Sequence, residues 1–286
     1  MNLIDTHAHL YWDSFEDDLG EVIKRSIDTG VTTIINVGVD VELSKKALTQ
    51  TQGKLANIPG LTAYSTIGIH PHEAIKYSSD VSIRKDIEKL EQIYLSATAD
   101  VTAVGECGLD YYFDPEFSPS SLSAEQVKSL QRQLFQSQID LAKKLNLPLI
   151  VHCRDDRSKN PENSEAWNEV LQMVGNHPTV LHCYSGLLPT TNYILQTPNL
   201  LVSFAATVTY PKNEYLREAI KILPLEKIAL ETDCPFLPPQ SKRGQRNEPA
   251  NILEIAQLVA ELKGTSLEEI VEHTSTNVAK LFALRT

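Results

Sequence analysis

Short apolar segments alternate with amphipathic segments along the whole chain, and this alternation limits the possible folds more than any other feature. The apolar segments are rich in Val and Ile, which is typical of strands buried on both faces of a parallel sheet. The predicted strands are Asn2–His7, Thr32–Val37, Ala63–Gly68, Val101–Glu106, Pro148–His152, Thr179–His182, Leu200–Ser203 and Lys227–Glu231. The predicted helices are Phe15–Asp28, Val41–Gln52, Ser79–Ser96, Ala124–Leu145, Glu165–Val174, Pro189–Gln196, Asn213–Leu223 and Pro249–Leu262. This repeated β–α pattern, without a break in composition, predicts an α/β protein with a single (β/α)8 TIM barrel.

The length of the chain agrees with one barrel followed by a short helical tail. Barrels of this kind commonly have a size near the 286 residues of this chain. We place the barrel at residues 1–264 and C-terminal helices, packed on the same domain, at residues 265–286. The tail starts at a capping box, Ser266-Leu267-Glu268-Glu269, and includes a further segment at Asn277–Leu284.

Charge and hydropathy indicate the setting in which the protein works. The formal net charge of −11 argues against a broad electrostatic contact with nucleic acid, although it allows a local basic patch. No apolar run approaches the roughly 20 residues that span a bilayer. The first residues lead directly into a predicted strand, without a basic leader. We therefore expect a cytoplasmic protein with no membrane contact and no obligate protein partner.

The histidines follow the pattern that a catalytic barrel requires. Active sites in this fold lie at the carboxyl ends of the strands. His7, His152 and His182 end predicted strands, and His9 and His70 lie just beyond the first and the third. Because side chains on a strand alternate with a period of two, His7 and His9 point the same way. The sequence therefore predicts a cluster of imidazoles at one rim of the barrel, which core packing does not explain.

Two carboxylates complete a predicted metal site. Glu106 ends the fourth predicted strand, and Asp233 lies just beyond the eighth. Both follow apolar residues, where an unpaired carboxylate would be costly and a metal ion would remove the cost. The predicted ligands are His7, His9, Glu106, His152, His182 and Asp233.

Six ligands are too many for a single open catalytic zinc site, so we expect two divalent metal ions. In this interpretation His7, His9 and Asp233 hold one ion, His152 and His182 hold the other, and Glu106 bridges them. Imidazole and carboxylate ligands suit Zn²⁺, Mn²⁺ or Fe²⁺ and suit Mg²⁺ less well, so the identity of the ions stays open.

The motifs around these residues resemble those of the TatD family of metal-dependent deoxyribonucleases. The matching stretches are Asp5-Thr6-His7-Ala8-His9, Gly68-Ile69-His70-Pro71-His72, Gly105-Glu106-Cys107-Gly108-Leu109-Asp110, Pro148-Leu149-Ile150-Val151-His152-Cys153-Arg154, His182-Cys183-Tyr184-Ser185-Gly186, Glu231-Thr232-Asp233-Cys234-Pro235 and Arg246-Asn247-Glu248-Pro249. The resemblance implies a dinuclear site and 3′→5′ exonuclease activity on DNA. It also places Asn247 and Glu248 near the site. The polar stretch Asp155–Glu165 is longer than the family pattern and leaves the shape of the substrate mouth open.

Individual roles follow from this interpretation. Two ions activate water for attack on a phosphodiester, and Asp233 is the candidate to orient that water and accept its proton. Glu106 is counted with it among the catalytic residues because it joins the ions. His70 is predicted to assist catalysis or to bind the phosphate, and Arg154 is a second phosphate candidate that could equally form a salt bridge.

Aromatic side chains in the loop after Glu106 are candidates for stacking on an unpaired base, although they could equally fill the core of a lid. They are Tyr111, Tyr112, Phe113 and Phe117, of which Tyr112 is our candidate substrate contact. The favoured substrate is single-stranded DNA. All four cysteines follow a predicted ligand, and strand alternation turns them away from it, toward the helices.

Two other classes of function stay open. One is an amidohydrolase, such as an amidase, lactonase or deaminase, on the same barrel. Many dinuclear amidohydrolases use a carboxylated lysine on the fourth strand, whereas no lysine lies between Ala99 and Tyr112 here. This favours phosphodiester hydrolysis. The other alternative is a scaffold without activity, which has no reason to keep a costly polar rim.

Overall fold

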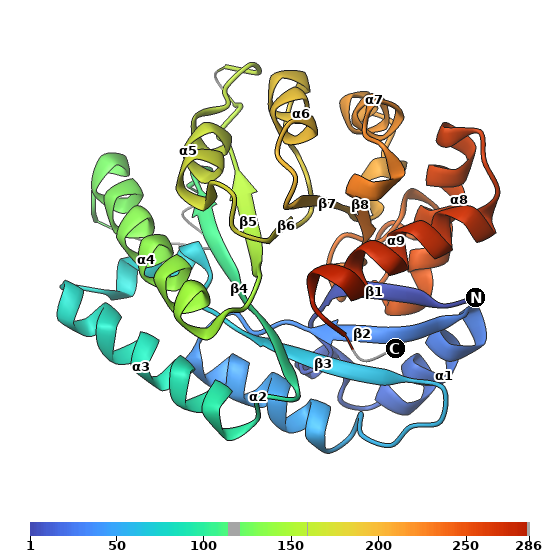
Figure 1. Ribbon diagram of the computed structural model, residues 1–286, viewed down its shortest axis with the longest axis horizontal. Coiled ribbons are helices and arrows are strands. Elements are labelled where there is room, and N and C mark those ends of the chain that lie inside the picture. The colour runs from blue at the N-terminus through green and yellow to red at the C-terminus, as the bar shows by residue number, and fades with distance from the viewer. Residues whose placement is uncertain (114–120, 159, 285–286) are drawn as a thin grey trace.

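The structure is a computed structural model that describes residues 1–113, 121–158 and 160–284. Eight parallel strands form one sheet in sequence order, and each strand pairs with the next one along the chain. The strands are β1 (Leu3–Ala8), β2 (Val31–Asn36), β3 (Thr62–Ile67), β4 (Val101–Asp110), β5 (Leu149–Arg154), β6 (Thr179–Leu181), β7 (Leu200–Phe204) and β8 (Ile228–Leu230). The predicted (β/α)8 barrel is therefore confirmed, and Figure 1 shows the strands enclosed by helices.

The helices form the outer layer because each buries one apolar face against the sheet. They are α1 (Leu19–Thr29), α2 (Val41–Gln52), α3 (Asp80–Ser96), α4 (Ala124–Leu145), α5 (Glu165–Val174), α6 (Leu188–Leu195), α7 (Glu214–Ile222), α8 (Ile252–Lys263) and α9 (Leu267–Leu281). Within the residues that the structure describes, no helix combines the length and apolar character needed to cross a membrane.

The barrel closes between β8 and β1 at the carboxyl rim. Ala8 bridges to Cys234, and the backbone N–H of His9 donates to the carbonyl oxygen of Cys234 over 2.8 Å. The N–H of Asp233 donates to the carbonyl of His7 over the same distance. The seam that closes the sheet thus fixes three of the predicted metal ligands relative to one another.

The opposite end of the barrel is filled by apolar side chains. Inward-facing residues such as Ile35, Ile150 and Val180 form one cluster, and Val278 and Phe282 from the α9 region pack into it. This apolar cluster therefore lies between that end of the barrel and the polar groups at the rim. Cys107, Cys153 and Cys234 belong to the other cluster, between sheet and helices, which agrees with the outward direction predicted for them.

The tail differs from the prediction, because α9 is one continuous helix and not two segments. Ser266 caps its start, as the capping box predicts, by accepting a hydrogen bond from the N–H of Glu269. The side chain of Asn277 donates to the carbonyls of Leu225 and Ile228 over 2.7 and 2.9 Å. These bonds tie the middle of the helix to the sheet, and such tertiary contacts override weak local propensity.

Strand β4 also differs, because it continues four residues beyond Glu106 to Asp110. Two glycines in this strand allow β4 to lie close to β5. A Cβ at Gly105 would lie 2.4 Å from the carbonyl oxygen of Ile150, and one at Gly108 would lie 2.0 Å from that of His152. The pairing shifts register between Val104 and Cys107, and this irregularity includes Glu106.

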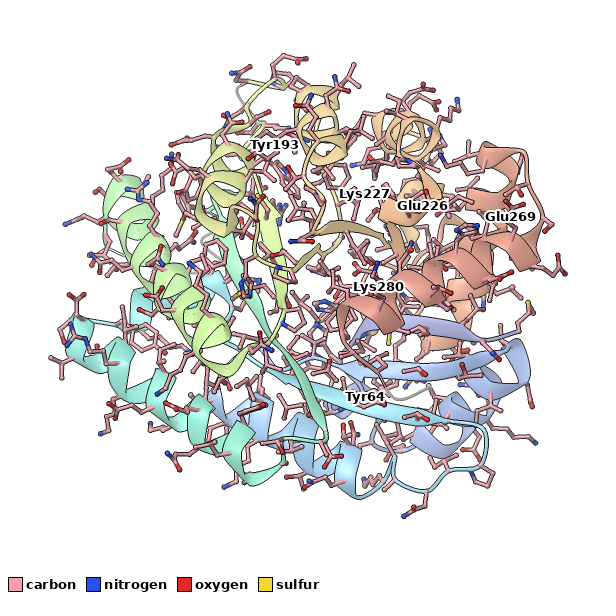
Figure 2. The ribbon with its side chains drawn as sticks, in the orientation of Figure 1. Tyr64, Tyr193, Glu226, Lys227, Glu269 and Lys280 are labelled. Atoms are coloured by element: carbon pink, nitrogen blue, oxygen red, sulfur yellow. The ribbon has the colours of Figure 1, made fainter. Side chains whose placement is uncertain are left out.

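We predict that Phe282→Ala lowers the free energy of unfolding by about 3–5 kcal/mol, because it empties the packed end of the barrel. Urea unfolding measures the change. The matched control is Tyr193→Ala on α6, an exposed aromatic (labelled in Figure 2) whose loss is expected to change stability by no more than about 0.5 kcal/mol. Equal stability of the two variants would contradict a packing role for Phe282.

Candidate metal centre

The six predicted ligands converge at the carboxyl rim, with the buried carboxylate of Glu106 at their centre. One oxygen of Glu106, Oε2, faces the ligands from the β1 side. It lies 3.3 Å from Nε2 of His7 and 3.8 Å from Nε2 of His9. Asp233 approaches the same group, with Oδ1 3.5 Å from Nε2 of His9. His7, His9 and Asp233 are close enough together to hold one cation.

The other oxygen of Glu106, Oε1, faces a second group of imidazoles. It lies 2.9 Å from Nδ1 of His152, 3.2 Å from Nε2 of His182 and 3.4 Å from Nε2 of His70. The two oxygens of one carboxylate therefore point to two separate sets of nitrogen atoms. This is the arrangement that a bridging ligand requires.

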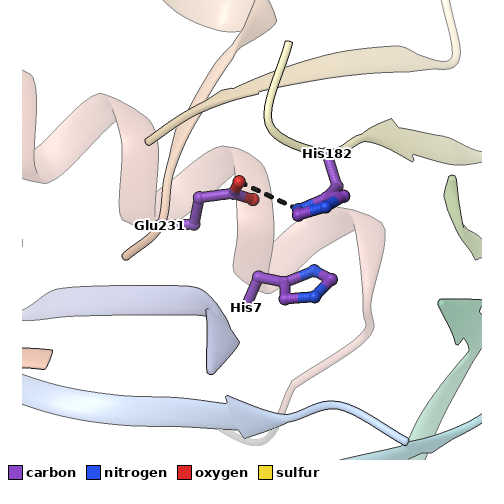
Figure 3. Close-up of side chains that lie close together, drawn as sticks. All are labelled: His7, His182 and Glu231. Carbon is purple, nitrogen blue, oxygen red and sulfur yellow. Dashed lines mark hydrogen bonds and ion pairs between the residues drawn. The ribbon is translucent and has the colours of Figure 1, made fainter. Parts of the chain in front are cut away.

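Three of these histidines have an acceptor behind the ring. His182 Nδ1 lies 2.9 Å from Oε1 of Glu231, as Figure 3 shows. His152 Nε2 lies 3.0 Å from Oδ2 of Asp110, and His9 Nδ1 lies 2.9 Å from the carbonyl oxygen of Val37. When a ring carries only the proton that it donates outward, the lone pair of its other nitrogen is available to a cation at the centre of the site.

His7 is held differently from the other histidines. Its ring stacks on His182, with ring centroids 3.7 Å apart, and Figure 3 shows the two rings lying against each other. Its Nδ1 is buried without a hydrogen-bond partner among the described residues. Burial lowers the pKa of His7 to about 3, so the imidazole is neutral near pH 7.

The central charges depend on one another. Burial alone would raise the pKa of Glu106, but the surrounding histidines hold it well below its usual range. Burial opposes charge on His152 as well, yet its hydrogen bonds to Asp110 and Glu106 raise its pKa to about 9. Without a cation, a protonated imidazole must therefore balance the carboxylates.

These donors fit a divalent metal ion. The inward-facing atoms are imidazole nitrogens and carboxylate oxygens, which Zn²⁺ and Mn²⁺ accept together. The carboxylates behind His152 and His182 form the carboxylate–histidine pairs typical of metal sites, and they favour the ring orientation that a cation needs. The geometry thus supports a metal centre at this rim.

Three buried carboxylates that sequence analysis had not assigned support this site. They are Asp5, Asp110 and Glu231. Asp5 accepts hydrogen bonds from the N–H and hydroxyl of Thr232 over 2.9 and 2.6 Å, which ties β1 to the chain beyond β8. For Asp110 and Glu231 a signal was present, because each lies an even number of residues from a predicted ligand and would share its inward direction.

Two buried glutamines on α4 hold the rim from outside the barrel. The side-chain amide of Gln138 accepts from the N–H of Ile69 over 2.7 Å and donates to its carbonyl over 2.8 Å. Gln131 makes the same pair of bonds with the backbone of Asp110, over 2.9 and 2.8 Å. Each glutamine replaces a strand partner, so the backbone beside His70 and at Asp110 is held firmly.

His70 lies on the rim as predicted and is mostly buried. Its Nδ1 accepts a hydrogen bond from the backbone N–H of His72 over 3.2 Å. Burial lowers the pKa of His70 to about 4, so the ring is neutral and carries its single proton on Nε2. His70 therefore presents an N–H donor to the site, whereas a metal ligand would need a lone pair there.

Arg154 and Tyr112 lie together at the ends of β5 and β4. The guanidinium of Arg154 stacks on the ring of Tyr112, 4.0 Å from its centroid. Within the described residues no acidic side chain pairs with Arg154, so its N–H groups are available. Tyr111 is buried instead and donates its hydroxyl to Glu169 over 2.7 Å. Phe113 packs beside Tyr111, and Phe117 lies outside the described residues.

Asn247 and Glu248 hold the chain beyond β8 in place. Asn247 is fully buried, and its amide donates to the carbonyls of Thr232 and Phe236 over 2.8 and 2.7 Å. Glu248 forms an ion pair with Arg25 over 2.7 Å. These contacts make Asn247 a positioning residue for the loop that carries Asp233, and they pair the carboxylate of Glu248 with Arg25. The substrate contacts predicted for both residues stay predictions.

The long polar stretch after β5 has a structural contact at its start. Asp155 caps α5 by accepting a hydrogen bond from the N–H of Ala166 over 2.7 Å. Arg157 lies 3.6 Å from the same carboxylate. This part of the stretch therefore anchors α5 beside the rim.

The barrel and the converging donors define the class of a metal-dependent hydrolase. A family model described as "TatD related DNase" matches residues 4–283. The chain therefore belongs to the TatD family of metal-dependent hydrolases, and the resemblance seen in its motifs is confirmed.

Named relatives agree with this assignment. The chain is 34% identical over 282 residues to the "Uncharacterized metal-dependent hydrolase YabD" of Bacillus subtilis (strain 168), with 99% of each chain covered. It is 32% identical over 289 residues to the "3′-5′ ssDNA/RNA exonuclease TatD" of Pantoea ananatis (strain LMG 20103), covering 99% of this chain and 100% of the relative. The crystal structure of the TatD homologue YJJV from Escherichia coli K12 matches with a TM-score of 0.81 and 28% identity, covering 99% and 98% of the two chains.

We predict that Asp110→Asn weakens metal binding by about 10- to 100-fold. Oδ2 of Asp110 faces both His72 and His152, and an asparagine amide cannot serve as an oxygen acceptor for the rings and for the N–H of Tyr112 at once. Competition with a metal-binding dye measures the change. Asp140→Asn, at an exposed position of α4, is the control, and equal affinity in both variants would contradict the role of Asp110.

Proposed function

We propose that the protein hydrolyses phosphodiester bonds of nucleic acid, with single-stranded DNA as the favoured substrate, using two divalent ions. The carrying observation is that the two oxygens of Glu106 face separate sets of ligands. A carboxylate that joins two cations suits in-line displacement at phosphorus. The relative named a 3′-5′ ssDNA/RNA exonuclease supports the same substrate and direction of cleavage.

Three side chains have separate roles in the proposed reaction. Two bound ions would lower the pKa of a water molecule toward 7 and offset charge on the phosphate. Asp233, at the open side of the ligand group, orients the attacking water and accepts its proton. Arg154 contacts a phosphate oxygen through its unpaired N–H groups. The Nε2–H of His70 donates a hydrogen bond to the phosphate or to the leaving oxygen and keeps its proton.

Metal analysis followed by a parallel assay tests the proposal. The purified protein is loaded with Zn²⁺ or Mn²⁺ and offered labelled single-stranded DNA, RNA and a small phosphodiester. Amide and lactone substrates are run beside them. We expect loss of nucleotides from the 3′ end of the DNA strand. Turnover of only an amide or a lactone would overturn the proposal in favour of an amidohydrolase.

Glu106→Ala is expected to lower metal content and activity together, because it removes the carboxylate shared by both groups. Wild-type protein should hold two ions per chain at saturation, measured by elemental analysis and anomalous scattering. Exposed Glu218→Ala on α7 is the matched control and should behave as wild type. A Glu106→Ala protein with normal metal content and turnover would show that this carboxylate is only structural.

His70→Ala is expected to keep both ions and the melting temperature while lowering the single-turnover rate by about 10²–10³, or about 2.7–4 kcal/mol in barrier. The reason is that His70 supplies one donor to the developing charge. His70→Gln, which restores an N–H donor, should recover part of the rate. If His70→Ala loses an ion, the residue is a ligand and the assigned proton position is wrong.

A further inference from the structure

Four aromatic rings form a closed cluster beside the metal centre. His9 contacts Tyr11 and Phe236, with ring centroids 5.8 and 6.0 Å apart. Trp12 completes the cluster, 5.9 Å from Tyr11 and 5.9 Å from Phe236. His9 and Tyr11 are buried, whereas Phe236 is 47% exposed. Of the four rings, Phe236 therefore has the most surface available to contact a bound substrate.

The loop that carries Phe236 is held rigidly. The N–H of Phe236 donates to the carbonyl of Asp233 over 2.9 Å. The buried amide of Asn247 donates to the carbonyl of Phe236 over 2.7 Å and to that of Leu237 over 3.3 Å. Because the backbone is fixed on both sides of the residue, the ring keeps its place three positions from Asp233.

Burial does not explain why a phenyl ring is held there. A fixed aromatic ring that is half open to solvent is suited to stacking on a planar group. The group that lies next to a phosphodiester in the proposed substrate is a nucleobase. Stacking on unpaired bases is the usual contribution of aromatic side chains to binding of single strands.

The net charge of the chain is a second, independent reason to expect base stacking at Phe236. With a net charge of −11, the protein gains little from long-range attraction to phosphates. A single strand must then be held by contacts that do not depend on net charge. Stacking satisfies this condition, and a phenyl ring has no polar group with which to select one base over another.

We propose that Phe236 is the stacking platform for an unpaired base next to the bond that is cleaved, backed by Trp12 and His9. This inference rests on the proposed function and deepens it. It assigns Phe236 to substrate binding and predicts a preference for single-stranded ends with little preference among bases.

The test compares Phe236→Leu with wild type in the metal-loaded protein. The probe is a fluorescein-labelled strand of twelve deoxythymidines whose 3′-terminal linkages are phosphorothioates. Matched strands lack the base at one of the last three positions. Fluorescence anisotropy gives Kd. Tyr193→Leu, also 47% exposed but on α6, is the control.

We expect Phe236→Leu to raise Kd for the complete strand by about 5- to 140-fold, which corresponds to about 1–3 kcal/mol for one stacked base. Removing the base at one position should weaken wild-type binding by a similar factor and leave the variant unaffected. Phe236→Trp should restore binding, and metal content should be unchanged in all variants. On cleavable strands KM should rise while kcat is kept.

Two results would overturn the inference alone. One is a Phe236→Leu protein that binds every strand as wild type does. The other is an equal loss of affinity for complete strands and for each strand that lacks a base, which would place the role of Phe236 in the loop. Wild-type protein that neither binds nor cleaves any strand would instead remove the proposed function, and this inference with it.

Discussion

The buried carboxylate of Glu106 is the interaction on which the rest of the rim depends. An isolated charge at such a depth costs several kcal/mol, and it persists only where opposite charges and hydrogen bonds surround it. Here imidazoles from four strands or the loops beyond them face its two oxygens. Asp110 and Glu231 in turn face two of those imidazoles from behind. The site is therefore one network, and a cation would replace the protonated imidazole that now balances it.

The fold provides this network with a stiff frame. Three features hold the backbone next to the ligands and do not contact the ligand side chains. They are the pairing of β8 with β1, the two glycines of β4 and the two glutamines of α4. The opposite end of the barrel is packed mainly by apolar side chains, to which α9 contributes. Stability and site geometry are thereby located at opposite ends of the same strands, a division that is usual in this fold.

Sequence analysis predicted the eight strands, the rim and the converging ligands because a period of two fixes the direction of each side chain relative to its neighbours. His7, His9 and Glu106 could be placed in this way. The supporting carboxylates could not be assigned, since Asp110 or Glu231 alone looks like any residue of a buried ion pair. The loop role of Asn247 depends on partners up to fifteen residues away, which no local pattern reveals. The prediction ended β4 at Glu106, four residues too early, because close pairing of Gly105 and Gly108 with β5 is a tertiary contact that no local pattern reveals.

The net negative charge of the chain bears on how a nucleic acid substrate would be bound. A protein that bound nucleic acid mainly through lysines and arginines would lose affinity steeply as the salt concentration rises. It would also bind duplex as readily as single strands. In the proposed function the attraction for phosphate would come from the rim, where cations would lie among Glu106, Asp233 and the histidines. Such a short-range attraction acts only on a phosphate that reaches the bottom of the site. Under the proposed function, cations held at this rim would therefore favour strand ends over continuous duplex without any contact that reads sequence.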